Sequence, residues 1–116
     1  MDKTINIVHI KFKIITKRST IYFNALLKAP ENRRMGILQA FPAFVIDDLI
    51  EIIYNVVLGN VEIGRKSANL KKYQKTLLKL VDTKGKKTRR GIIYRQKGGF
   101  LGAILPIVMS VLGSML

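Results

Sequence analysis

Most of the positive charge of this chain lies in one basic block, Arg65–Lys97. The block holds thirteen lysines and arginines and one acid, Asp82, so its net charge is +12. Such side chains neutralise phosphates and release condensed counterions, which gives tight, salt-sensitive binding without sequence preference. The block therefore predicts contacts with the phosphates of double-stranded DNA. The residues expected to make these contacts are Arg65, Lys66, Lys71, Lys72, Lys75, Lys79, Lys86, Lys87, Arg89, Arg90 and Arg95.

A solvated basic face is the alternative interpretation of the same block. Two tyrosines, Tyr73 and Tyr94, lie among the bases and could stack on nucleobases. Tyr73 also belongs to an apolar stripe at helical spacing, so packing in a core is its favoured role. The run Lys84–Arg90 has the composition of a nuclear-localisation signal as well.

The residues that could support catalysis or bind a metal do not form a known motif in this sequence. His9 is the only histidine, and the chain has no cysteine. Asp47 and Asp48 are adjacent, so on a helix their side chains point about 100° apart, and no histidine lies nearby. No phosphate-binding loop, dinucleotide fingerprint or zinc-protease motif occurs. We therefore expect no enzyme activity, metal or cofactor. We expect Asp47, Asp48 and Glu51 to be solvated and to be stabilised by the dipole of the helix that carries them.

The apolar segment Gly98–Leu116 contains no charged residue. As a helix, Phe100–Leu116 would be about 25 Å long, against a hydrocarbon core of about 30 Å, and Pro106 would weaken or kink it. Two interpretations stay open: a separate tail that contacts a membrane or a partner, and a final helix that closes the core of a bundle. The separate tail is favoured, because only two serines interrupt the apolar surface. Its contact residues would be Phe100, Leu101, Ile104, Leu105, Val108 and Leu112.

Two glycines, Gly98 and Gly99, separate the basic block from the apolar segment. Because glycine is conformationally permissive, the pair predicts a flexible hinge between parts with different roles. Beyond the hinge, small residues recur at every fourth position and would form a narrow helix face that permits close approach of another helix. These residues are Gly102, Pro106, Ser110 and Ser114.

The elements expected to carry these residues are helical. Phe41–Leu58 has aliphatic residues at spacings of three and four, with Pro42 suited to its first turn. Ser67–Asp82 predicts a second helix, with Ser67 as its N-cap. Its apolar stripe would consist of Leu70, Tyr73, Leu77 and Leu80 or Val81. Lys84–Lys97 predicts a short third helix or a mobile basic arm, because glycines interrupt it.

The first forty residues show the least regular pattern. Ile10–Ile14 alternates apolar and basic side chains, which is the period of a half-exposed strand, and Thr20–Ala29 is compatible with a short helix that ends before Pro30. Lysines and arginines interrupt the apolar residues, so no cleaved signal peptide is expected. We predict a mostly α protein with three parts. These are a basic leader, poorly ordered or a short strand (residues 1–40), a basic domain built as a helical hairpin or three-helix unit (41–97), and a separate hydrophobic helix (98–116).

Composition limits the class of protein further. With 116 residues and 48% hydrophobic residues, the chain can bury the core of about one domain. A net charge of +14 favours an anionic partner, either a polyanion or a membrane surface. The absence of cysteine excludes disulfide scaffolds and zinc-finger DNA binders.

The order of these features resembles a viral family. The stretch RQKGGFLGAILPI (residues 95–107), in which basic residues precede Gly-Gly and an apolar Leu-Pro segment, resembles the precursor of the adenoviral small core protein X (mu). Residues 24–99, with Asn55–Val61 and Leu70–Leu77, are similar to short basic proteins of adenovirus-like mobile elements of the Polinton or adintovirus group and to their invertebrate genomic copies.

The resemblance implies a virion core protein that binds and condenses viral double-stranded DNA, located in the virion and the host nucleus. It also implies that a viral maturation protease separates the apolar segment near Gly98 and Gly99. Such proteases prefer a large apolar side chain two residues before the Gly-Gly pair, where this chain has Gln96. The alternative functions are a membrane-active or membrane-anchored protein that inserts the apolar segment, and a structural protein of the capsid interior.

Overall fold

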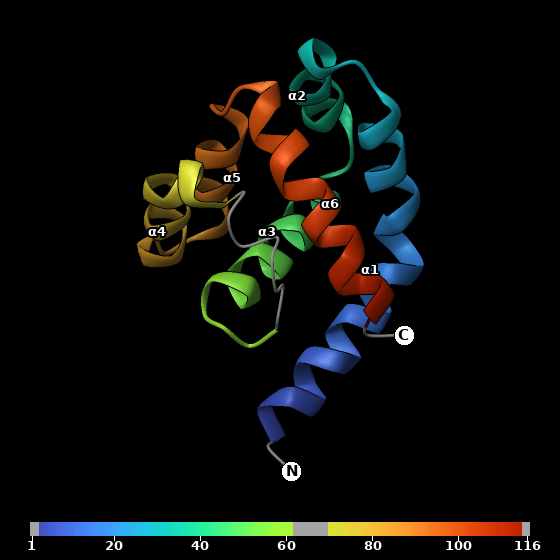
Figure 1. Ribbon diagram of the computed structural model, residues 1–116, viewed down its shortest axis with the longest axis vertical. Coiled ribbons are helices and arrows are strands. Elements are labelled where there is room, and N and C mark those ends of the chain that lie inside the picture. Colours follow the sequence, from blue (N-terminus) through green and yellow to red (C-terminus); the bar gives the residue numbers. More distant parts are fainter. Residues whose placement is uncertain (1–2, 62–69, 115–116) are drawn as a thin grey trace.

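Six α helices account for most of the residues that the structure describes, which are 3–61 and 70–114. The structure is a computed structural model, and no strand occurs within these ranges. The predicted mostly α class is therefore confirmed (Figure 1). The helices are α1 (Lys3–Lys28), α2 (Glu31–Ala40), α3 (Ala43–Val57), α4 (Gln74–Asp82), α5 (Lys86–Tyr94) and α6 (Gly98–Ser114).

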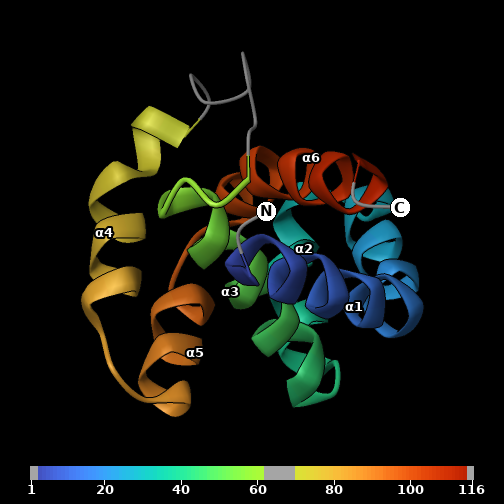
Figure 2. The ribbon, with the colours of Figure 1, turned by 90° about the horizontal axis from the view of Figure 1, so that it is seen from below.

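The apolar segment forms α6, which lies along one face of the molecule and packs against α1 and α3 (Figures 1 and 2). It also packs against α2. The six side chains expected to contact a membrane or partner are each at most 2% exposed: Phe100, Leu101, Ile104, Leu105, Val108 and Leu112. The expectation of a separate tail is therefore wrong. The apolar segment is instead the final helix that closes the core, which was the alternative interpretation. A helix that is apolar on nearly every side is stable in water only when other helices cover it.

Small residues on α6 accommodate the side chains of α2. A Cβ atom added to Gly102 would lie 2.9 Å from Nη1 of Arg34, and one added to Gly99 would lie 2.9 Å from Oε1 of Glu31. Pro106, which interrupts the hydrogen-bond ladder of α6, is exposed. The close approach predicted for the small-residue face therefore occurs at Gly102, and it involves side chains of α2 rather than a second apolar helix.

The expected hinge at Gly98 and Gly99 is also not found. α6 begins at Gly98, and the backbone N–H of Phe100 donates a hydrogen bond to the carbonyl of Lys97 at 3.0 Å. Only the residues 95–97 connect α5 to α6. Gly-Gly therefore lies in the first turn of a helix, where it allows Glu31 to pack close to the backbone.

The predicted leader (residues 1–40), poorly ordered or with a short strand at Ile10–Ile14, instead forms the long helix α1 and the shorter helix α2. The buried side chains Phe12, Ile15, Phe23 and Leu26 of α1 recur at multiples of three and four residues and face α3 and α6. An alternation over five residues cannot distinguish a period of 2 from one of 3.6, because residues four apart also share a helix face. Ser19, in the same stripe, is fully buried as well.

Helices α3, α4 and α5 pack against one another, and α3 also packs against α1 and α6, so these three helices are part of a larger core. α3 begins two residues after the predicted start at Phe41, with Pro42 as its N-cap. The predicted second helix corresponds to a 3₁₀ turn at 70–73 followed by α4, while Ser67 lies outside the described residues. Residues 84–97 contain α5, so the alternative of a short third helix describes this segment.

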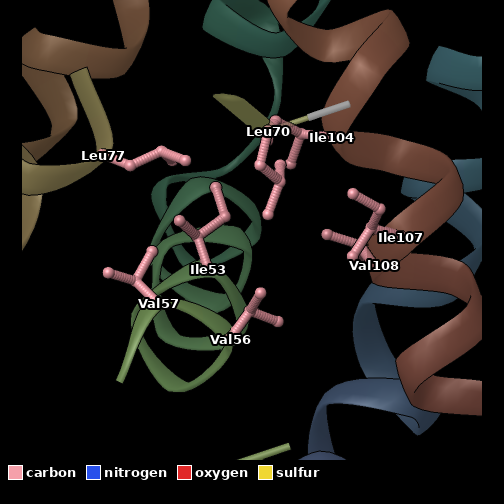
Figure 3. A pocket seen from close by; sticks show the side chains of 8 residues that line it. All are labelled: Ile53, Val56, Val57, Leu70, Leu77, Ile104, Ile107 and Val108. Atoms are coloured by element: carbon pink, nitrogen blue, oxygen red, sulfur yellow. The ribbon is translucent and has the colours of Figure 1, made fainter. Parts of the chain in front are cut away.

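An apolar seam joins α3, α4 and α6 (Figure 3). The cavity within it has a volume of about 10 Å³, so it is a packing gap rather than a ligand site. All of its lining side chains are aliphatic: Ile53, Val56, Val57, Leu70, Leu77, Ile104, Ile107 and Val108. Leu77 and Leu80 of the predicted apolar stripe are buried, so the stripe faces the core as expected.

Candidate nucleic-acid interface

Helices α4 and α5 lie side by side at one edge of the molecule, on the side away from α1 (Figures 1 and 2). Residues 70–97, which contain both helices, carry eleven basic residues and one acid. Two of the predicted contact residues, Arg65 and Lys66, lie outside the described residues. The others are distributed over the 70–73 turn, α4, α5 and the residues that follow α5.

A groove of about 190 Å³ lies between α4 and α5. We call it the α4–α5 groove, and its lining residues are Lys75, Thr76, Lys79, Ile92, Arg95 and Gln96. The hydroxyl of Thr76 donates a hydrogen bond to Oε1 of Gln96 at 3.4 Å, and Nε2 of Gln96 donates to the carbonyl of Ile92 at 3.0 Å. These bonds fix the polar surface between the two helices.

Three of the predicted bases converge on this groove. Lys75 and Lys79 are one helical turn apart on the same face of α4, about 6 Å along its axis. Arg95, the C-cap residue of α5, approaches from the other side. All three are exposed, and none belongs to an ion pair among the described residues. The lining contains no carboxylate, so no acid in the groove offsets the mutual repulsion of the three like charges.

Arg89 and Arg90, also predicted to contact phosphates, have partners within the chain. Arg90 donates two hydrogen bonds to Asp47, from Nε at 2.6 Å and from Nη2 at 2.5 Å, and these bonds raise the pKa of Arg90 above its ordinary value. Arg89 donates from Nε to the carbonyl of Thr83 at 2.6 Å, and its guanidinium lies 5.2 Å from the ring centre of Tyr54. Both arginines therefore hold α5 against α3 and position the groove.

The three acids of α3 are ion-paired, so the expectation that they are solvated is wrong. Asp48 is buried and accepts hydrogen bonds from Nε of Arg18 at 2.7 Å, from Nη2 of Arg18, and from the hydroxyl of Ser19 at 2.6 Å. The bonds to Asp48 raise the pKa of Arg18. Glu51 accepts a bond from Nζ of Lys11 at 3.2 Å.

The lysines at the start of α5 differ in their surroundings. Lys86 lines a cavity of about 410 Å³ that also contains Asp47, Asp48 and Glu51, so it faces carboxylates. Lys87 is exposed in the first turn of α5, where the helix dipole disfavours a cation unless an anion binds nearby. The sequence pattern gave both lysines the same role, and the structure separates them.

The 70–73 turn presents two further predicted bases, Lys71 and Lys72, which are both exposed. Nζ of Lys72 lies 5.8 Å from the ring centre of Tyr73. The ring of Tyr73 in turn packs edge-on against Phe100, with 5.2 Å between ring centres. This confirms the favoured role of Tyr73 in packing. Tyr94 is half-buried, and burial raises the pKa of its phenol.

Sequence reasoning missed the polar part of the groove and the ion pairs that support it. Thr76 carries no charge and was not predicted to have a role, and Gln96 was considered only for its position two residues before the Gly-Gly pair, although each is four or fewer residues from a groove base. A helical projection of the two segments would have placed them on the basic face. The pairing of Asp47 with Arg90 links residues 43 apart and has no local signal.

Comparison of the chain with protein-family models, curated proteins and solved structures yields no match. Within residues 3–61 and 70–114, no single helix has both the length and the apolar character needed to cross a membrane. Lys86–Tyr94 and Gly99–Gly113 meet that criterion only as a pair, bent by 119°. The same described ranges contain no group of three or more His, Asp or Glu side chains that could hold a metal ion.

Proposed function

We propose that this protein binds double-stranded DNA through its phosphates and without sequence preference. The α4–α5 groove is the centre of the interface, and Lys75, Lys79 and Arg95 make its principal contacts. The exposed bases Lys71 and Lys87 extend the interface along the same edge of the molecule.

The convergence of three unpaired bases on one groove carries this proposal. Arg90, Arg18 and Lys11 are neutralised by carboxylates of α3, whereas the groove contains no acid. Arginine presents a planar fork that matches phosphate oxygens, and lysine acts as a mobile point charge. A phosphate in the groove would also relieve the repulsion between the three bases.

The resemblance to adenoviral core proteins extends the proposal to a biological role. A core protein in the virion must neutralise and condense the genome, and a net charge of +14 on 116 residues suits that task. We therefore propose that the protein compacts viral DNA in the virion and acts in the host nucleus. Sequence-independent phosphate contacts are the mode of binding that such compaction requires.

A salt titration of DNA affinity tests this proposal. Fluorescence anisotropy with a 20-base-pair duplex, measured from 50 to 300 mM NaCl, should give a linear plot of log Kd against log salt. The three groove bases alone predict a slope of about 2.7, because each neutralised phosphate contributes about 0.9. Flanking lysines that take part would increase the slope.

A second duplex of unrelated sequence and equal length is the control. The Kd values for the two duplexes should agree within about twofold, since phosphate contacts carry no sequence information. A slope below about 1, or a tenfold preference for one duplex, would overturn phosphate binding as the mechanism.

A further inference from the structure

The surface of α1 that faces away from the core carries a row of isoleucines. Ile7, Ile10, Ile14 and Ile21 are 54%, 59%, 52% and 74% exposed. They are four of the six large hydrophobic side chains that are exposed in the described part of the chain. Burial of such side chains against a partner is favourable in water, so a concentration of them on one helix indicates an interaction surface.

The spacing of these isoleucines is that of a coiled-coil seam. When Ile7 is given position a of a heptad, Ile14 and Ile21 also fall at a, and Ile10 falls at d. The core residues Phe12, Ser19 and Leu26 fall at f, on the opposite side of the helix. We call the row Ile7–Ile10–Ile14–Ile21 the isoleucine seam. It is one side chain wide, which suits a partner helix better than a lipid surface, since interfacial helices present a broad apolar face.

The charges beside the seam specify the partner. α1 contains no acid. Every charged residue at an a, d, e or g position that has a described side chain is basic and exposed: Lys11, Lys13, Lys17, Arg18 and Lys28. Lys11 and Arg18 already pair with Glu51 and Asp48 of α3, so the bases that a partner would meet are Lys13, Lys17 and Lys28. A second copy of this chain would place bases against bases, which costs free energy at such positions. A helix with acidic flanks would instead place carboxylates beside these bases.

We infer that α1 binds an acidic amphipathic helix of another protein. The partner packs apolar side chains between the isoleucines and places glutamates or aspartates beside Lys13 and Lys17. β-branched residues at a favour pairing of two helices, and the seam has isoleucine at three a positions. This surface is on α1 and the proposed DNA groove is between α4 and α5, so the inference does not rest on the proposed function.

A designed peptide tests the inference on the full chain. The probe has three heptads with Ile at a, Leu at d and Glu at e and g. One control peptide has the same composition in scrambled order, and another keeps the pattern with Lys at e and g. Calorimetry at 150 mM NaCl should show that the patterned acidic peptide binds at least tenfold more tightly than either control.

Variants of the seam locate the binding. Ile10→Gln with Ile14→Gln should weaken binding of the patterned acidic peptide at least tenfold. Leu58→Gln with Leu78→Gln removes two other exposed apolar side chains and should leave the affinity unchanged. DNA affinity and the circular dichroism of both variants should match the wild type, which shows that they fold.

Several results would overturn the inference. Equal binding of the scrambled peptide would mean that charge alone attracts it. Unchanged affinity in Ile10→Gln/Ile14→Gln would place the peptide elsewhere. If the wild type formed a dimer and this variant did not, the seam would be assigned to a second copy of the chain. The seam would be assigned to lipid if the wild type bound vesicles with 30% phosphatidylserine, the variant did not, and neither bound the patterned acidic peptide.

Discussion

Asp48 is the residue whose role the structure changes most. It lies in the middle of α3 and is 3% exposed, and its carboxylate joins Arg18 and Ser19 of α1. The adjacent Asp47 holds Arg90 of α5. Two neighbouring acids that point in different directions therefore attach two different helices to α3, as their separation of about 100° allows.

Replacement of Asp48 by Ala should lower the free energy of unfolding by about 1–3 kcal/mol, because the buried hydroxyl of Ser19 loses its acceptor. The contribution of Arg18 is at the low end, since its side chain is 49% exposed and solvent screens the pair. Urea unfolding followed by circular dichroism measures the change.

The matched control is Asp82→Ala, which removes an exposed acid that has no ion pair among the described residues. This substitution changes the net charge equally and should alter stability by less than about 0.5 kcal/mol. Equal losses in the two variants would mean that Asp48 acts through net charge and not through its contacts.

At the residue scale, the basic block predicted eleven phosphate-contacting residues, and Lys75, Lys79 and Arg95 are three of them. Nothing in the sequence separated these three, which line the groove, from the other eight. Arg89 and Arg90 belong to the same basic block, yet they contact Asp47 and Tyr54 of α3. The difference depends on contacts across 43 residues for Arg90, and no local pattern encodes such a contact.

At the element scale, α6 is the central part of the fold. α1, α2 and α3 all pack against it, and its aliphatic side chains complete the core. The sequence established that this segment is helical and apolar but not what covers it. A buried helix and a membrane-inserted tail have the same composition. The short alternating pattern of Ile10–Ile14 also predicted a strand where α1, one of the helices that cover α6, lies.

Leu105→Ala tests the role of α6. Leu105 is fully buried, so the substitution should lower the free energy of unfolding by about 2–5 kcal/mol and reduce the Tm of the whole chain. Ser110→Ala, on the exposed side of the same helix, should change it by less than about 0.5 kcal/mol. If α6 were a separate tail, Leu105→Ala would leave the cooperative unfolding of the other helices unchanged, and thermal unfolding of both variants distinguishes the cases.

At the scale of the whole molecule, the described acids and bases are sorted by position. Asp47, Asp48 and Glu51 lie on α3 and neutralise bases of α1 and α5 from within. Much of the unpaired positive charge is left on the α4–α5 edge, and the isoleucine seam lies on α1, away from that edge (Figure 2). The arrangement would allow the chain to hold DNA and a partner helix at the same time.

The most direct test of this account compares two variants of equal charge. The groove variant is Lys75→Gln, Lys79→Gln and Arg95→Gln, and the control is Lys13→Gln, Lys17→Gln and Lys28→Gln on α1. At 150 mM NaCl the groove variant should bind a 20-base-pair duplex at least tenfold more weakly and lose about 2.7 from its salt slope, whereas the control should change the Kd less than threefold. Equal losses of affinity in the two variants would contradict the account, because DNA would then respond to net charge and not to the groove.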